Sequence, residues 1–170
     1  MQILGSFDEA HAKVLRDTQR CLDVINRLSA TACDSVEAGI AVLDRLRRET
    51  YEDLNQIQHE HLIISSAEWL AMNHNLGGDL TWTWNPRQTG DNTEPDLRGV
   101  RNGAVVLSAE VTTSERPVGT IDTRMKSTLT KLAAMAGLRY YFVRTSSMAQ
   151  RATTKVAKAG WRITVVNLGA

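Results

Sequence analysis

The sequence is short of several features that would assign a protein to a class at once. It has two cysteines in 170 residues, Cys21 and Cys33, and their spacing matches no metal-ligand motif. No apolar run approaches the roughly 20 residues needed to span a bilayer, and no signal peptide is recognisable at the start. We therefore expect reduced thiols, a soluble cytoplasmic protein and no membrane partner.

Net charge is also nearly absent, with 20 Lys and Arg residues against 19 Asp and Glu residues. This balance by itself predicts no polyanionic partner. The distribution is uneven, because ten Lys or Arg residues lie from Arg116 onward against one acidic residue, Asp122. The carboxy-terminal third is therefore basic, and most of the acidity lies in the amino-terminal part.

A hydrophobic content of 42% and a charged content of 23% are ordinary for a folded protein of one domain, or one domain with an appendage. Ser6 and Glu9 form a capping-box pattern before a run with helical periodicity. Asp34 and Glu37 repeat the start signal, and the second helical pattern continues to about residue 75 with a break near Tyr51. The first part of the chain is therefore predicted to be helical.

The periodicity changes at residue 80, where "LTWTW" alternates strictly as strands do. Further patterns predict strands at 95–100 and 104–113, a helix at 121–136, a strand at 140–144, a helix at 147–159 and a strand at 161–168. Asn102-Gly103 is a typical hairpin turn between the second and third strands. We expect an α/β fold with a mixed sheet at 58–170, preceded by a helical appendage at 1–57 that serves dimerisation or DNA contact.

A carboxylate interrupts the strand at 104–113. Val105, Leu107, Ala109 and Val111 point to one side by alternation, so Glu110 points to the other. Asp96 lies on the preceding strand, joined by the tight turn. Two carboxylates in one pocket suit a hard divalent cation, with water and a phosphate oxygen completing its coordination.

These residues resemble a known family. Pro95-Asp96, thirteen intervening residues and then Glu110-Val111-Thr112 look like the motif of the PD-(D/E)xK nuclease superfamily, which has a restriction-endonuclease-like fold. The resemblance covers roughly residues 60–168. It implies that Asp96 and Glu110 bind Mg²⁺, or alternatively Mn²⁺, and that the backbone carbonyl of Val111 is a third ligand.

The motif lysine is replaced by Thr112, which cannot carry a positive charge. The resemblance places Thr112 at this catalytic position, while relatives that lack the lysine supply the charge from a neighbouring helix. Lys126 is the candidate, because it lies early in the helix that follows Glu110. Lys131 is more than a turn further along, and Arg124 is a weaker alternative.

Relatives also carry a carboxylate on the helix before the sheet, and Glu68 fits that position better than Glu60. A solvated helix face explains either residue equally well. The histidines match no standard zinc spacing. Phosphate contacts are expected from basic residues near the two acids, namely Arg87, Arg98, Arg124 and Arg144.

Taken together, the sequence predicts a Mg²⁺-dependent endonuclease that hydrolyses DNA, acting in restriction, repair or mobile-element processing. A homodimer would let two sites cut two strands. Because Thr112 replaces the lysine, the alternative is an inactive nuclease-like fold that serves as a DNA-binding or assembly subunit. A helical interaction module with an unrelated α/β domain is a third interpretation, which would place the two acids far apart.

Overall fold

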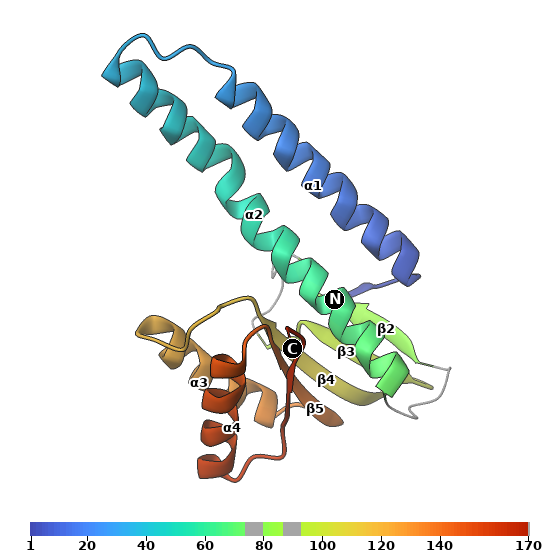
Figure 1. Cartoon of the computed structure of the whole chain (residues 1–170). Coiled ribbons are helices and arrows are strands. Elements are labelled where there is room, and N and C mark those ends of the chain that lie inside the picture. Colours follow the sequence, from blue (N-terminus) through green and yellow to red (C-terminus); the bar gives the residue numbers. More distant parts are fainter. Residues whose placement is uncertain (74–79, 87–92, 170) are drawn as a thin grey trace.

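The computed structural model of the chain describes residues 1–73, 80–86 and 93–169. Figure 1 shows a sheet with helices on both faces and a long helical hairpin that projects beyond it. The elements follow in the order β1 (Gln2–Ile3), α1 (Phe7–Ser29), α2 (Val36–Asn73), β2 (Thr81–Trp84), β3 (Leu97–Arg101), β4 (Ala104–Thr112), α3 (Thr120–Ala133), β5 (Leu138–Val143), α4 (Ser146–Ala159) and β6 (Thr164–Asn167).

The sheet has its strands in the same order as the chain, from β1 to β6. Strands β1 to β4 pair antiparallel, whereas β4, β5 and β6 pair parallel. Parallel neighbours need crossover connections, which α3 and α4 supply. The predicted α/β fold with a mixed sheet and an amino-terminal helical region is therefore confirmed, while its restriction-endonuclease-like identity stays a prediction.

The two faces of the sheet pack against different helices. Leu107, Ala109 and Val111 of β4 join the core beneath α2, as the alternation predicted. On β5, Phe142 points to the same core, whereas Tyr141 joins a second core with α3 and α4. Glu110 lies on the face that α3 covers, opposite to α2.

The turn between β3 and β4 is the predicted Asn102-Gly103 pair. Both residues have positive φ, 50° for Asn102 and 77° for Gly103. Two-residue hairpin turns that match the twist of the strands require this conformation. The turn pairs Arg101 with Ala104, and a β-bulge between Gly99 and Val100 then shifts the register by one residue, so that Leu97 faces Ala109 across the two strands. This register positions the two acidic residues of the motif.

Helix α2 is longer than the sequence suggested. It runs unbroken from Val36 to Asn73, through Tyr51 and through the expected boundary at residue 57. No proline falls within it, so nothing in the sequence forces a break. Its first turn is capped by the Ser35 hydroxyl, which accepts a hydrogen bond from the Ala38 amide, rather than by Asp34. The capping box of α1 at Ser6 and Glu9 is confirmed.

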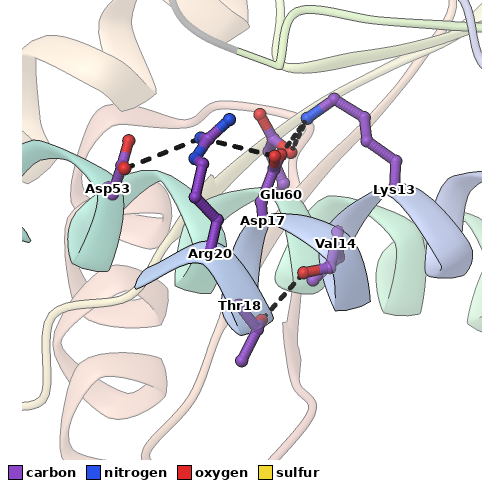
Figure 2. A network of polar contacts seen from close by, with 7 residues as sticks. All are labelled: Lys13, Val14, Asp17, Thr18, Arg20, Asp53 and Glu60. Atoms are coloured by element: carbon purple, nitrogen blue, oxygen red, sulfur yellow. Dashed lines mark hydrogen bonds and ion pairs between the residues drawn. The ribbon is translucent and has the colours of Figure 1, made fainter. Parts of the chain in front are cut away.

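An ion-pair network joins α1 to α2 (Figure 2). Lys13 Nζ lies 2.5 Å from a carboxylate oxygen of Glu60 and 2.8 Å from one of Asp17. Arg20 lies between Asp17 and Asp53, at 3.4 and 3.6 Å. Glu60 is only 2% exposed, so its charge is taken out of water and depends on Lys13.

None of the helices within the described ranges has both the length and the apolar character that crossing a membrane requires.

Candidate functional site

Asp96 and Glu110 are brought together by the β3–β4 hairpin. Leu97 pairs with Ala109, so the next position along the ladder sets Asp96 beside Glu110 on the same face of the sheet. Both side chains are buried, at 3% and 4% exposure. The convergence of the two acids that the motif demanded is therefore present.

The Asp96 carboxylate is held in place by its surroundings. Its Oδ2 accepts a hydrogen bond of 2.9 Å from the Val111 amide, and its backbone carbonyl accepts one of 2.9 Å from the Asn85 amide. His59 of α2 brings its Nε2 to 3.4 Å from the same Oδ2. Neither ring nitrogen of His59 has a hydrogen-bond partner among the residues that the structure describes.

The cation beside Glu110 is Lys131, which the sequence placed behind Lys126 as a candidate. Lys131 Nζ of α3 lies 2.6 Å from Glu110 Oε1 and donates a hydrogen bond of 3.2 Å to the Glu94 carbonyl. Burial and the negative charge of Asp96 raise the pKa of Glu110 to about 8, although Lys131 opposes the rise. At neutral pH the site therefore favours one proton, or one added cation, next to its two acids.

The two acids open onto a cavity of about 490 Å³, which we call the carboxylate cavity. Its wall comes from the end of β4 on one side and from α3 on the other. Met148 of α4 and Tyr141 of β5 also line it. The lining residues that the site uses are Asp96, directly before β3, together with Glu110, Val111 and Thr112 of β4 and Arg124 and Thr128 of α3.

Thr112, at the position of the motif lysine, is engaged by a neighbour. Its hydroxyl accepts a hydrogen bond of 3.4 Å from the Ser114 amide, and Tyr141 lines the same cavity. Burial raises the pKa of Tyr141 far above its usual range, and the negative charges of Glu110 and Asp96 add to the rise. Tyr141 therefore stays neutral, so neither Thr112 nor Tyr141 brings a charge to the cavity.

Lys126 does not lie at Glu110, which corrects the choice made from the sequence. It lines a different cavity of about 330 Å³, here called the basic groove, together with Arg151, Lys155, Lys158 and Trp161. The reason is helical periodicity, since Lys126 is two residues and about 200° from Arg124 on α3. Lys131 is seven residues from Arg124, which returns it to the same face.

The third predicted carboxylate is also placed elsewhere. Glu68 lies on α2, which covers the opposite face of the sheet. Its Oε1 forms a hydrogen bond of 2.9 Å with Nε2 of His11 on α1. Glu60 is occupied by Lys13. Across the described parts of the chain, no cluster of three or more Asp, Glu, His or Cys side chains is arranged to hold a metal ion.

Of the four predicted phosphate-binding arginines, the three within the described residues are dispersed. Arg124 lines the carboxylate cavity. Arg98 lies on β3 two residues after Asp96, and its Nε is buried without a hydrogen-bond partner among the described residues. Arg144 bonds Gln58 and lines a separate cavity beside α2. Arg87, like His74 and much of the loop before Asp96, lies outside the described residues.

From the sequence, Lys131 ranked behind Lys126, and His59 was not connected with the site. The spacing of Arg124, Thr128 and Lys131 on one helix face was a readable signal for Lys131. Nothing in the sequence linked His59 to Asp96, because their contact depends on the packing of α2 against the sheet. A scan of protein-family models gives no match, and no curated protein or solved structure matches the chain.

Proposed function

We propose that this protein is a metal-dependent endonuclease that hydrolyses DNA phosphodiester bonds. One observation carries the proposal: two buried carboxylates lie side by side, with the Lys131 ammonium 2.6 Å from one of them, at an open cavity. Two acids with one close cation at a cavity match the needs of phosphoryl chemistry.

The donor set suits a hard divalent ion. Mg²⁺ is commonly held by one or two carboxylates, with waters and substrate phosphate completing its octahedron. Asp96 and Glu110 supply the two carboxylates, and Val111 supplies a backbone carbonyl at the same strand end. Burial and, second, the negative charge of Asp96 raise the pKa of Glu110, and a bound dication would favour its charged form. The residues present therefore fit Mg²⁺ or Mn²⁺.

A bound divalent ion polarises a phosphate oxygen and lowers the pKa of a coordinated water. The chain's own residues have separate tasks. The Val111 amide orients Asp96, and the Glu94 carbonyl holds Lys131 at the cavity. Lys131 then stabilises the charge that develops on the phosphate, in place of the lysine that Thr112 replaces.

Cations near the cavity support a polyanionic substrate. Arg124 and Lys126 lie on the same helix, one lining the carboxylate cavity and the other the basic groove. A phosphate backbone that enters the cavity would therefore meet positive charge on both sides of α3. Such contacts supply most sequence-independent affinity for DNA.

The deciding experiment is incubation with plasmid, single-stranded and branched DNA and with RNA, in Mg²⁺, Mn²⁺ or EDTA. Asp96→Ala and Glu110→Ala should abolish cleavage and leave the circular dichroism spectrum unchanged. Lys131→Met should lower the cleavage rate about 100-fold or more, because a charge-stabilising donor is removed. Lys126→Met is the matched control on the same helix: it should weaken DNA binding through the basic groove and leave the cleavage rate at saturating DNA unchanged, because Lys126 does not line the carboxylate cavity. Metal-dependent cutting that persists in both carboxylate variants would refute the assignment.

A second function is favoured by one feature of the site. Lys131 already neutralises Glu110, and the Thr112 hydroxyl is engaged by the Ser114 amide, so the same fold could bind DNA without cutting it. Calorimetric titration with Mn²⁺ separates the two. Metal binding that Asp96→Ala abolishes supports the nuclease, whereas DNA binding without any metal binding supports an inactive DNA-binding or assembly subunit.

A further inference from the structure

The helical hairpin exposes large apolar side chains. Each is at least 43% exposed, which is unusual for residues of this size. Most lie on the part of the hairpin that projects beyond the sheet in Figure 1. We call this set the hairpin face, and its members are Leu15 and Leu22 of α1 and Val36, Ile40, Leu43, Tyr51 and Leu54 of α2.

These side chains share one side of the hairpin. On α1, Leu15 and Leu22 each follow a buried residue by one position, since Val14 and Cys21 face α2. On α2 the same offset recurs, because Tyr51 follows the buried Thr50. The helices are antiparallel, so an equal offset in each helix turns both sets toward the same side.

The spacing on α2 is that of a helix-packing seam. Positions 36, 40, 43, 47, 51 and 54 recur at intervals of three or four residues, and all but Arg47 are apolar. Such a stripe on a helix ordinarily packs against another helix. The stripe of α2 about 100° round the helix already packs against α1, so the hairpin face is left for a partner from outside the chain.

The size of the hairpin face is suited to a modest interface. Val36 to Leu54 spans about 27 Å of helix, and two helices side by side are about 20 Å wide. Monomers rarely expose contiguous apolar patches larger than a few hundred Å². Two such faces in contact would bury on the order of 1,000 Å², near the lower end of specific interfaces.

The charges within the face indicate a second copy of this chain as the occupant. Ion pairs at this level of the hairpin join Glu49 to Arg27 and Arg45, and none among the described residues uses Asp44 or Arg47. Antiparallel pairing of two α2 helices centred near residue 45 sets Arg47 of each copy against Asp44 of the other. Parallel pairing in register would instead oppose Arg47 to Arg47, which is unfavourable.

We propose that the hairpin face pairs with the hairpin face of a second copy, with the two α2 helices antiparallel about a two-fold axis. The contact is isologous, so it closes with two chains. Val36 of one copy lies at the level of Leu54 of the other, and Arg47 pairs with Asp44. The dimer does not depend on the proposed nuclease activity, because none of its residues lines the carboxylate cavity.

Sedimentation equilibrium tests the dimer directly. The wild-type chain at about 100 µM, above the micromolar Kd typical of a small interface, should give twice the 18.8 kDa chain mass. Ile40→Glu with Leu43→Glu should give a monomer, because two charges would be buried without partners. Ala41→Glu is the control, since Ala41 is exposed one position outside the stripe. Its mass should match the wild type, and all variants should keep their helical circular dichroism.

A charge exchange tests the pairing of the two copies. Arg47→Asp should raise the dimer Kd about tenfold, and Asp44→Arg combined with it should restore the wild-type Kd. A wild-type chain that is monomeric at about 100 µM overturns the proposal and assigns the face to a different protein. An unchanged Kd in the Ile40→Glu, Leu43→Glu variant also overturns it. DNA cleavage assays are independent of either result.

Discussion

Glu110 is a carboxylate whose surroundings differ strongly from water. It is 4% exposed, next to the like charge of Asp96, with Lys131 as its compensating cation. Its pKa rises from 4.5 to about 8 as a result. Between these two values the folded, metal-free protein keeps a proton that the unfolded chain releases, so stability falls as the pH rises through this window.

Glu110→Gln should therefore stabilise the metal-free protein in a pH-dependent way. Glutamine keeps the shape of the side chain and cannot ionise, so the variant escapes the cost of the charged form. We expect a gain on the order of a few kcal/mol above pH 8 and none below pH 4.5. Urea unfolding in EDTA across this range measures it. Glu52→Gln, at an exposed site, is the control, and a gain of equal size at every pH would contradict the explanation.

Part of the site was predictable residue by residue. Strand alternation and the Asn102-Gly103 turn are local signals that made the hairpin predictable, but the β-bulge between Gly99 and Val100, which shifts the register so that Asp96 faces Glu110, was not predicted from them. Which lysine lies beside Glu110 was not predictable, because a lysine side chain is long and its reach depends on which face of the helix packs inward. Lys131 lies on the face of Arg124, whereas Lys126 faces α4. His59 reaches Asp96 only through the docking of α2.

At the scale of elements, the contact between α1 and α2 depends on Lys13 and Glu60 (Figure 2). Lys13 is partly buried, which lowers its pKa. Hydrogen bonds to Asp17 and Glu60 outweigh that effect, so the pKa of Lys13 is raised overall. A buried carboxylate that loses its partner is costly, whereas an apolar pair of similar volume is often tolerated.

Lys13→Met should destabilise the protein by about 2 kcal/mol, since it leaves Glu60 buried without its cation and Lys13 is itself partly exposed. The double variant Lys13→Met, Glu60→Leu should recover most of that loss, because no charge remains. Urea denaturation at pH 7 measures both. A double variant that is less stable than the single one would show that the ion pair itself contributes net stability.

Elements with local signals were predicted well, and those with distant partners were not. The Ser6–Glu9 capping box and the strand at Thr81–Trp84 follow from neighbouring residues alone. Strand β1 has two residues and pairs with Thr83 and Trp84, which lie about eighty positions away. Such a pairing has no periodic signal in so short a segment.

At the scale of the whole molecule, one sheet separates two cores. Alternate residues of β5 enter different cores, with Phe142 on the α2 side and Tyr141 on the side of α3 and α4. Because the same strands line both cores, loss of either core removes the support of the sheet. We therefore expect the α/β part of the chain to unfold in a single cooperative transition.

Leu70→Ala on α2 and Leu129→Ala on α3 test this coupling. Both leucines are fully buried, so each variant should lose about 2–5 kcal/mol through the cavity that it creates. Each should shift one common thermal transition, whether followed by far-ultraviolet circular dichroism or by tryptophan fluorescence. Leu138→Ala, half exposed on β5, should change little. Two separate transitions in either core variant would show that the cores are independent.

The order of strands in the sheet has a consequence for biosynthesis. Because β2 to β6 are neighbours in both chain and sheet, each strand that leaves the ribosome meets a partner that has already emerged. No strand from β2 on must be inserted between two others, so the sheet can grow at one edge during translation. Strand β1 is the exception, since it waits for the whole helical hairpin to be made before Thr83 and Trp84 appear.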